Sequence, residues 1–297
     1  MKRKILFSSG IIGIILMLIG QFSFSINDVI VKLSVNELNS KFSTFNVLFI
    51  RGIITTFLIF IYLKIIERKK ILKILTIKNY HKRGIYEVLT ALFFFIGLIT
   101  LPVATVYTLL MTNPLFVTLF AYFFLKEKVG IRRWGAVVIG FVGVVFVINP
   151  ADINFSFLFI FPIIAAIFLT IRDIATKKII TKSNNFEIIF ITSILVTVFS
   201  GFISLYIDFE ITINQLPYLF ISGFFLTIGY LCAAMTIYYA PLSLTASSRY
   251  SVIIFGIIFG YIILNEIPNI NMLIGAIIIT ASGIFVIKRE KELGKIK

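Results

Sequence analysis

Long apolar blocks recur along the whole chain, and they limit its possible folds more than any other feature. A helix crosses the hydrocarbon core of a bilayer with about 20 apolar residues. We predict ten such spans, at residues 8–33, 44–66, 85–101, 103–125, 134–149, 155–176, 186–207, 217–239, 242–264 and 270–287. The blocks are too long and too uniform for barrel strands, so we expect an all-α integral membrane protein in a lipid bilayer.

Lysine and arginine are distributed unevenly between the loops. Only 14% of the 297 residues are charged, yet the net charge is +15. The basic residues collect at residues 64–83, 126–133 and 172–182 and in the tail at 288–297, whereas the alternate loops are poor in them. Because Lys and Arg mark cytoplasmic loops, we expect both termini to be cytoplasmic. Charge placed in this way indicates an orientation in the membrane, and we expect no nucleic-acid partner.

The second half of the chain repeats the first. Shifts of 139 to 145 residues align an ordered series of identical residues: Pro102 with Pro241, Phe116 with Phe255, Glu127 with Glu266, Asp28 with Asp173, and Lys32 with Lys177. Each half holds five spans, an odd number, so the second half crosses the membrane in the opposite sense. We therefore predict two inverted five-helix repeats, at residues 1–150 and 151–297, which is an arrangement typical of transporters.

Several of these segments resemble a known family. The stretches "LPVATVYTLLMTNPLFVTLFAYFFLKEKV" and "RYSVIIFGIIFGYIILNE", both ending near an acidic residue, resemble the EamA type of the drug/metabolite transporter superfamily. More narrowly, "NDVIVK" and "RDIATKK" resemble S-adenosylmethionine uptake transporters of intracellular bacteria. The resemblance implies a permease of the bacterial cytoplasmic (inner) membrane. It would move a small polar metabolite by alternating access, with uptake or exchange of S-adenosylmethionine as the first candidate.

Ionisable residues inside the spans are candidates for the substrate site, because a charge in lipid usually faces the bundle interior or water. Arg51 lies well inside the second span and would anchor a substrate carboxylate or phosphate, or else pair structurally with an aspartate such as Asp28. Asp28 would bind a cationic group or take up a coupling proton. Alternatively, it is solvated at the outer face or pairs with Lys32, four residues on.

Polar residues in other spans complete the candidate set. Asp173 and Lys32 are candidates for gating or coupling, with a network at the cytoplasmic helix end as the alternative for Asp173. Arg249 would reach the cavity together with Tyr250 or extend to the cytoplasmic face. Asn113 precedes Pro114 in the middle of the fourth span, and a kink there would form a polar wall of the site. Glu127 and Glu266 are interpreted as structural residues at equivalent helix ends.

Other function classes find little support in the chain. It offers no Walker loop, metal-ligand cluster or nucleophile elbow, so we expect neither enzymatic activity nor a cofactor. Two alternatives stay open: an exporter of amino acids or other metabolites from the same superfamily, and a receptor or scaffold that transports nothing. A coupling ion or counter-substrate is a possible further partner. Gly135, Gly140 and Gly143 would allow close helix contact, either within a monomer or across a homodimer.

The orientation is testable by cysteine labelling. On a background without Cys232, a cysteine at position 73 is expected to resist an impermeant thiol reagent in intact cells and to react after permeabilisation, because Lys73 lies in the most basic loop. Labelling of position 73 in intact cells would reverse the orientation.

Overall fold

The computed structural model describes residues 2–38, 40–124, 126, 129–149, 156–179, 184–240 and 245–292. Within these ranges, ten helical segments are long and apolar enough to cross a membrane. Helices satisfy their own backbone hydrogen bonds, which lipid cannot do for them. The predicted all-α fold class with ten spans is therefore confirmed.

The first half of the chain builds five of these spans from six helices, because α5 and α6 together form one span. They are α1 (Lys2–Asn36), α2 (Thr44–Ile61), α4 (Lys78–Thr100), α5 (Val103–Leu110), α6 (Asn113–Phe123) and α7 (Ile131–Ile148). Helix α2 continues through a π-helical turn at Tyr62–Ile66, and the short α3 (Ile71–Ile74) follows it in the basic loop.

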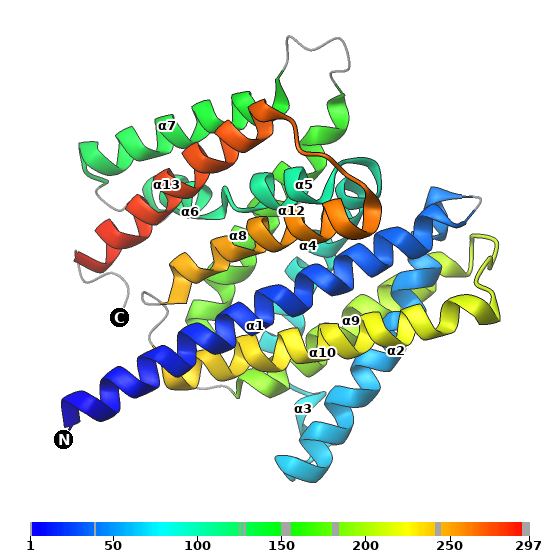
Figure 1. Ribbon diagram of the computed structural model, residues 1–297. Coiled ribbons are helices and arrows are strands. Elements are labelled where there is room, and N and C mark those ends of the chain that lie inside the picture. Colours follow the sequence, from blue (N-terminus) through cyan, green and yellow to red (C-terminus); the bar gives the residue numbers. More distant parts are fainter. Residues whose placement is uncertain are drawn as a thin grey trace.

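The second half builds the other five spans in the same order. They are α8 (Ile160–Ile179), α9 (Asn185–Ser204), α10 (Leu216–Tyr239), the 3-10 helix η6 (Ala246–Tyr250) that leads into α12 (Ser251–Leu264), and α13 (Ile270–Glu292). Helix α1 begins and helix α13 ends toward the same end of the bundle (Figure 1).

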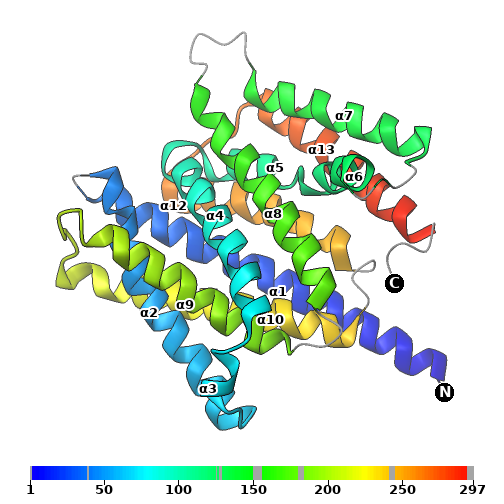
Figure 2. The ribbon, with the colours of Figure 1, turned by 180° about the vertical axis from the view of Figure 1, so that it is seen from behind.

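The packing of the helices follows the inverted repeat. Helix α1 packs along α10 and α4 packs along α8, while α2 contacts α9 and α7 contacts α13; the α4–α8 and α2–α9 contacts face the reader in Figure 2. Exchanging each span with its counterpart in the other half turns the α1–α10 contact into the α8–α4 contact. The α2–α9 and α7–α13 contacts map onto themselves, as a twofold axis between the halves requires.

The fourth span is broken where the sequence predicts a kink. Helix α5 ends at Leu110 and α6 begins at Asn113, with Pro114 in its first turn, where a missing N–H does no harm. A shift of 139 residues carries this break to the junction of η6 and α12 at Tyr250. Both halves therefore interrupt the same span at the same level, although only the first half uses a proline.

Helix α4 begins earlier than the predicted span, and this changes the place of Arg83. The sequence places Arg83 in the basic loop, whereas in the structure it lies inside α4 and is only 9% exposed. Its guanidinium donates to the hydroxyls of Thr176 and Thr192, and its Nη2 lies 3.1 Å from the carboxylate of Glu87, one turn further on. These partners compensate the charge that the apolar surroundings would otherwise penalise.

Close contact between α7 and its neighbours depends on glycine. A Cβ atom at Gly143 would come within 2.9 Å of the side chains of Ile278 and Ile279, and one at Gly140 would overlap Leu115. Gly135, on the same helix, has nothing within 4 Å of an added Cβ. Two of the three glycines that the sequence singles out thus serve a contact within the monomer.

A pair of valine substitutions tests this packing. Gly143→Val is expected to destabilise the protein by about 1–3 kcal/mol, because overpacking forces α7 away from α13. Gly135→Val makes the same change in helix propensity without a clash, so it serves as the matched control. The two are compared by thermal unfolding in detergent, and equal melting temperatures would contradict the contact.

Candidate functional site

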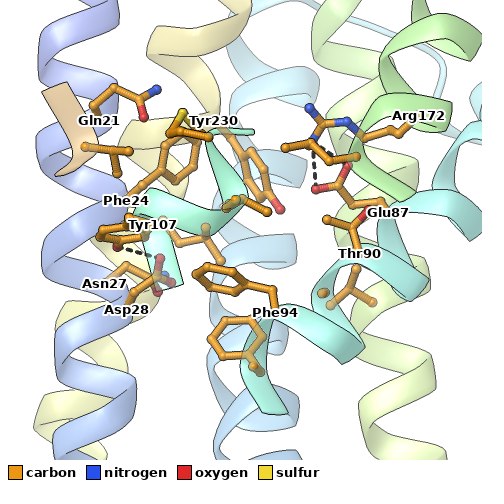
Figure 3. A pocket seen from close by; sticks show the side chains of 18 of the residues that line it. Gln21, Phe24, Asn27, Asp28, Glu87, Thr90, Phe94, Tyr107, Arg172 and Tyr230 are labelled. Atoms are coloured by element: carbon orange, nitrogen blue, oxygen red, sulfur yellow. Dashed lines mark hydrogen bonds and ion pairs between the residues drawn. The ribbon is translucent and has the colours of Figure 1, made fainter. Parts of the chain in front are cut away.

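A cavity of about 190 Å³ lies between the two halves. Residues from α1, α2, α4 and α5 line it together with residues from α8, α9, α10 and α12. Asp28 and Tyr107 lie on one side of it, and Glu87 and Arg172 lie on the other (Figure 3). The cavity therefore carries ionisable side chains on opposite walls and receives residues from both repeats.

The carboxylate of Asp28 is held by neutral donors. The hydroxyl of Tyr107 donates to Oδ2 at 2.8 Å, and the side-chain amide of Asn27 donates to Oδ1 at 2.7 Å. Tyr107 reaches this place because Gly256 on α12 leaves room for its ring, which a Cβ there would overlap. Asp28 is only 7% exposed, and the structure gives it no ion-pair partner within 4.0 Å among the residues it describes.

Arg51 lies close to this carboxylate without bonding to it. Its Nη1 donates to Oδ1 of Asn27 at 3.0 Å, and its guanidinium carbon lies 5.0 Å from the centroid of the Phe95 ring. The side chain is 3% exposed, and its Nε has no hydrogen-bond partner. The direct Arg51–Asp28 ion pair, the structural alternative considered for Arg51, is therefore not formed. An amide stands between the two charges.

Glu87 forms the opposite wall with Arg172. Nη1 of Arg172 donates to both carboxylate oxygens of Glu87, at 3.1 and 2.9 Å (Figure 3). Arg83 approaches the same carboxylate. Glu87 was not among the candidates predicted from the sequence, although it lies inside a predicted span and is ionisable like Arg51. Arg172 was grouped with loop residues, whereas it lines the cavity.

Asp173 joins the remaining candidates into a network beside the cavity. Arg172 bonds to Oδ1 of Asp173 at 2.6 Å, while Arg249 and the amide of Asn113 lie 3.5 and 3.2 Å from Oδ2. The hydroxyl of Tyr250 donates to the backbone carbonyl of Met111. Of the predicted substrate-binding residues, Asp28 and Arg51 line the cavity, and Asn113, Arg249 and Tyr250 adjoin it through these contacts.

Lys32 belongs to a different cluster, nearer the other ends of the helices. Its Nζ lies 2.5 Å from the carboxylate of Glu266 and also donates to the carbonyl of Leu101. The second oxygen of Glu266 accepts the backbone N–H of Val103 at 2.7 Å. Lys32 therefore pairs with Glu266 and not with Asp28, and it does not line the cavity. Glu127, the counterpart of Glu266, lies outside the described residues.

Aromatic rings cover much of the remaining wall. Phe94 stacks on Tyr107 with ring centroids 6.1 Å apart, and Phe24 meets Tyr230 edge-on at 5.7 Å. All four line the cavity. The sequence could not select them from 33 phenylalanines and 12 tyrosines, since nothing in it marks which side of a helix faces the cavity. Among the described residues, no group of three His, Cys, Asp or Glu could hold a metal ion.

Comparisons with known proteins agree with this architecture. The profile of the EamA-like transporter family matches residues 11–149 and 156–288. The S-adenosylmethionine uptake transporter of Rickettsia prowazekii (strain Madrid E) is 28% identical over 94% of both chains, and that of Rickettsia bellii is 30% identical over 66% of this chain and 67% of its own. A crystal structure with 14% sequence identity superposes with a TM-score of 0.59, over 94% of this chain and 98% of the other.

Substitution of Glu87 tests how much the buried side chains of Arg83 and Arg172 depend on its carboxylate. Glu87→Gln is expected to lower the free energy of unfolding by roughly 3 kcal/mol, because the buried guanidinium of Arg83 loses its carboxylate partner and that of Arg172 loses one of two. Glu37→Gln makes the same chemical change at an exposed site at the end of α1 and serves as the control. Denaturation in detergent compares the two, and similar losses would exclude the compensating role of Glu87.

Proposed function

Because the chain belongs to the EamA-like transporter family, we propose that this metabolite transporter takes up or exchanges S-adenosylmethionine by alternating access. It is a membrane carrier and not an enzyme. One observation carries the proposal: the cavity between the repeats holds a carboxylate and a guanidinium that do not pair with each other. Both charges are therefore available to a ligand that brings charges of its own.

The chemistry of S-adenosylmethionine matches this cavity group by group. The molecule carries an ammonium group, a carboxylate, a sulfonium and a flat adenine. Arg51 supplies a cation for the carboxylate, and Asp28 supplies an anion for the positive groups. The rings of Phe94 and Tyr230 offer surfaces for the adenine and for the sulfonium, which binds favourably over an aromatic face.

Two clusters on either side of the cavity act as gates. Pockets that hold drug-sized ligands measure about 300–1,000 Å³, and this cavity measures about 190 Å³. A drug-sized substrate therefore enters only when one side of the cavity opens. The Lys32–Glu266 bridge closes one end, and the contacts of Asp173 with Arg172 and Arg249 close the other. Opening them in turn would expose the cavity to each side of the membrane.

The relatives favour this substrate over others of the family. The S-adenosylmethionine transporter of Rickettsia prowazekii aligns along nearly the whole chain. We place the protein in a bacterial cytoplasmic membrane, and the lysine and arginine bias of the loops favours both termini inside. Within this proposal Asn113, Arg249 and Tyr250 border the substrate at the cytoplasmic side. Residues 1–150 and 151–297 form the two repeats that move against each other.

Uptake into proteoliposomes tests the proposal. Labelled S-adenosylmethionine is expected to accumulate saturably and to be competed by S-adenosylhomocysteine, which lacks the sulfonium charge. Arg51→Lys and Asp28→Asn are each expected to reduce uptake about tenfold, which corresponds to the loss of one charge-assisted contact. Glu37→Gln repeats the carboxylate-to-amide change at an exposed site and should leave uptake unchanged.

Two results would overturn the assignment. Uptake of S-adenosylmethionine no higher than in empty vesicles, together with clear transport of another amino acid or metabolite, would show that S-adenosylmethionine is not the substrate. Normal transport by Arg51→Leu would remove the anchoring role of Arg51.

A further inference from the structure

The side chain of Asn27 lies between the two unpaired charges of the cavity. Its Nδ2 donates to Asp28 at 2.7 Å, and its Oδ1 accepts from Arg51 at 3.0 Å and from the hydroxyl of Ser222 at 2.8 Å. Only 1% of Asn27 is exposed. Every bond it makes has the polarity that the neighbouring group requires. The amide donates toward the carboxylate and accepts from the guanidinium.

This bridge keeps apart two groups that would otherwise pair. A carboxylate and a guanidinium in a low-dielectric interior attract strongly and favour a forked, two-bond contact. Asn27 satisfies one bond of each, so Arg51 keeps an Nε without a partner and Asp28 keeps neutral partners only. A cavity that contained the direct ion pair would offer a ligand far less charge on either side.

The second repeat shows the alternative arrangement at the equivalent place. A shift of 145 residues carries Asn27 to Arg172 and Asp28 to Asp173. There the guanidinium bonds directly to the neighbouring carboxylate, through Nη2 at 2.6 Å and Nε at 3.1 Å. With a cation in place of the amide, the aspartate is neutralised and becomes part of a structural network. The residue before the aspartate thus decides whether its charge is free.

We propose that Asn27 is the specificity-determining residue of the cavity, and that it selects a ligand with an α-amino-acid group. The ammonium of that group meets Asp28 and its carboxylate meets Arg51. The ammonium and the carboxylate of such a ligand are bonded to the same carbon atom. The charges of Asp28 and Arg51 must therefore lie close together and yet remain unpaired. The inference rests on the proposed function only in taking this cavity as the transport site.

Binding of two matched ligands tests the selection. Wild-type protein is expected to bind S-adenosylmethionine more tightly than its decarboxylated analogue, which keeps the amine, sulfonium and adenine. Asn27→Asp gives Arg51 a permanent partner, so the ratio of the two dissociation constants should shift by about tenfold or more toward the analogue. Gln21→Glu is the matched control, because it adds the same charge to the same wall of α1 without touching the bridge. If the role of Asn27 were purely structural, Asn27→Asp would weaken the binding of both ligands by the same factor.

A second measurement needs no ligand. In Asn27→Ala, the thermal-stability coupling between Asp28→Asn and Arg51→Gln in a double-mutant cycle should exceed its wild-type value, because the two charges then meet. Should wild type bind neither ligand, the proposed substrate fails and this cycle alone decides the role of Asn27. The inference is overturned if Asn27→Asp weakens both ligands in proportion, if Gln21→Glu shifts the ratio equally, or if the coupling does not rise.

Discussion

A charge buried in a membrane interior must be compensated by the protein, and this requirement organises the bundle. On insertion scales an unpaired charge at the bilayer centre costs about 2.5–3.5 kcal/mol. Arg83, Glu87 and Arg172 meet the requirement by bonding between α4 and α8, and Arg249 extends the same network toward α12 through Asp173. The bonds that join different helices, Arg172–Glu87 and Arg249–Asp173, limit how far those helices can rotate or slide against each other. The cavity keeps its shape because its charged wall cannot relax without leaving a charge exposed to lipid.

Asp28 and Arg51 satisfy the same requirement in a less complete way. They are stabilised by Tyr107, Asn27 and the ring of Phe95, which are neutral groups. Neutral donors and acceptors make a buried charge tolerable without cancelling it. The wall with Asp28 and Arg51 therefore keeps its charges unpaired, whereas the charges of the wall between α4 and α8 are neutralised by ion pairs. The two repeats share the arrangement of their helices, but they differ in the side chains at equivalent positions, as Asn27 and Arg172 show.

Much of the fold could be predicted from the sequence, because apolar blocks show the spans and aligned residues show the repeats. Neither signal depends on tertiary contacts. The same holds for Asp28 and Arg51, whose cost in lipid makes them conspicuous. The pairing of Lys32 could not be predicted. Its spacing from Asp28 favours an i, i+4 contact, yet the side chain reaches Glu266 on another repeat. Arg83 was misplaced for a related reason, since two of its three partners, Thr176 and Thr192, lie on other helices. A single sequence gives the length of a span and not its rotation about its own axis.

Glu266 binds the side chain of Lys32 from α1 and the backbone N–H of Val103 at the start of α5, while it stands at the end of α12. One carboxylate thus joins two helices of the first repeat to one of the second. Because both contacts depend on a single group, both are lost together when Glu266 moves away. In the proposed alternating access, separation at this end would therefore be cooperative, with α1 and α5 released from α12 in one step.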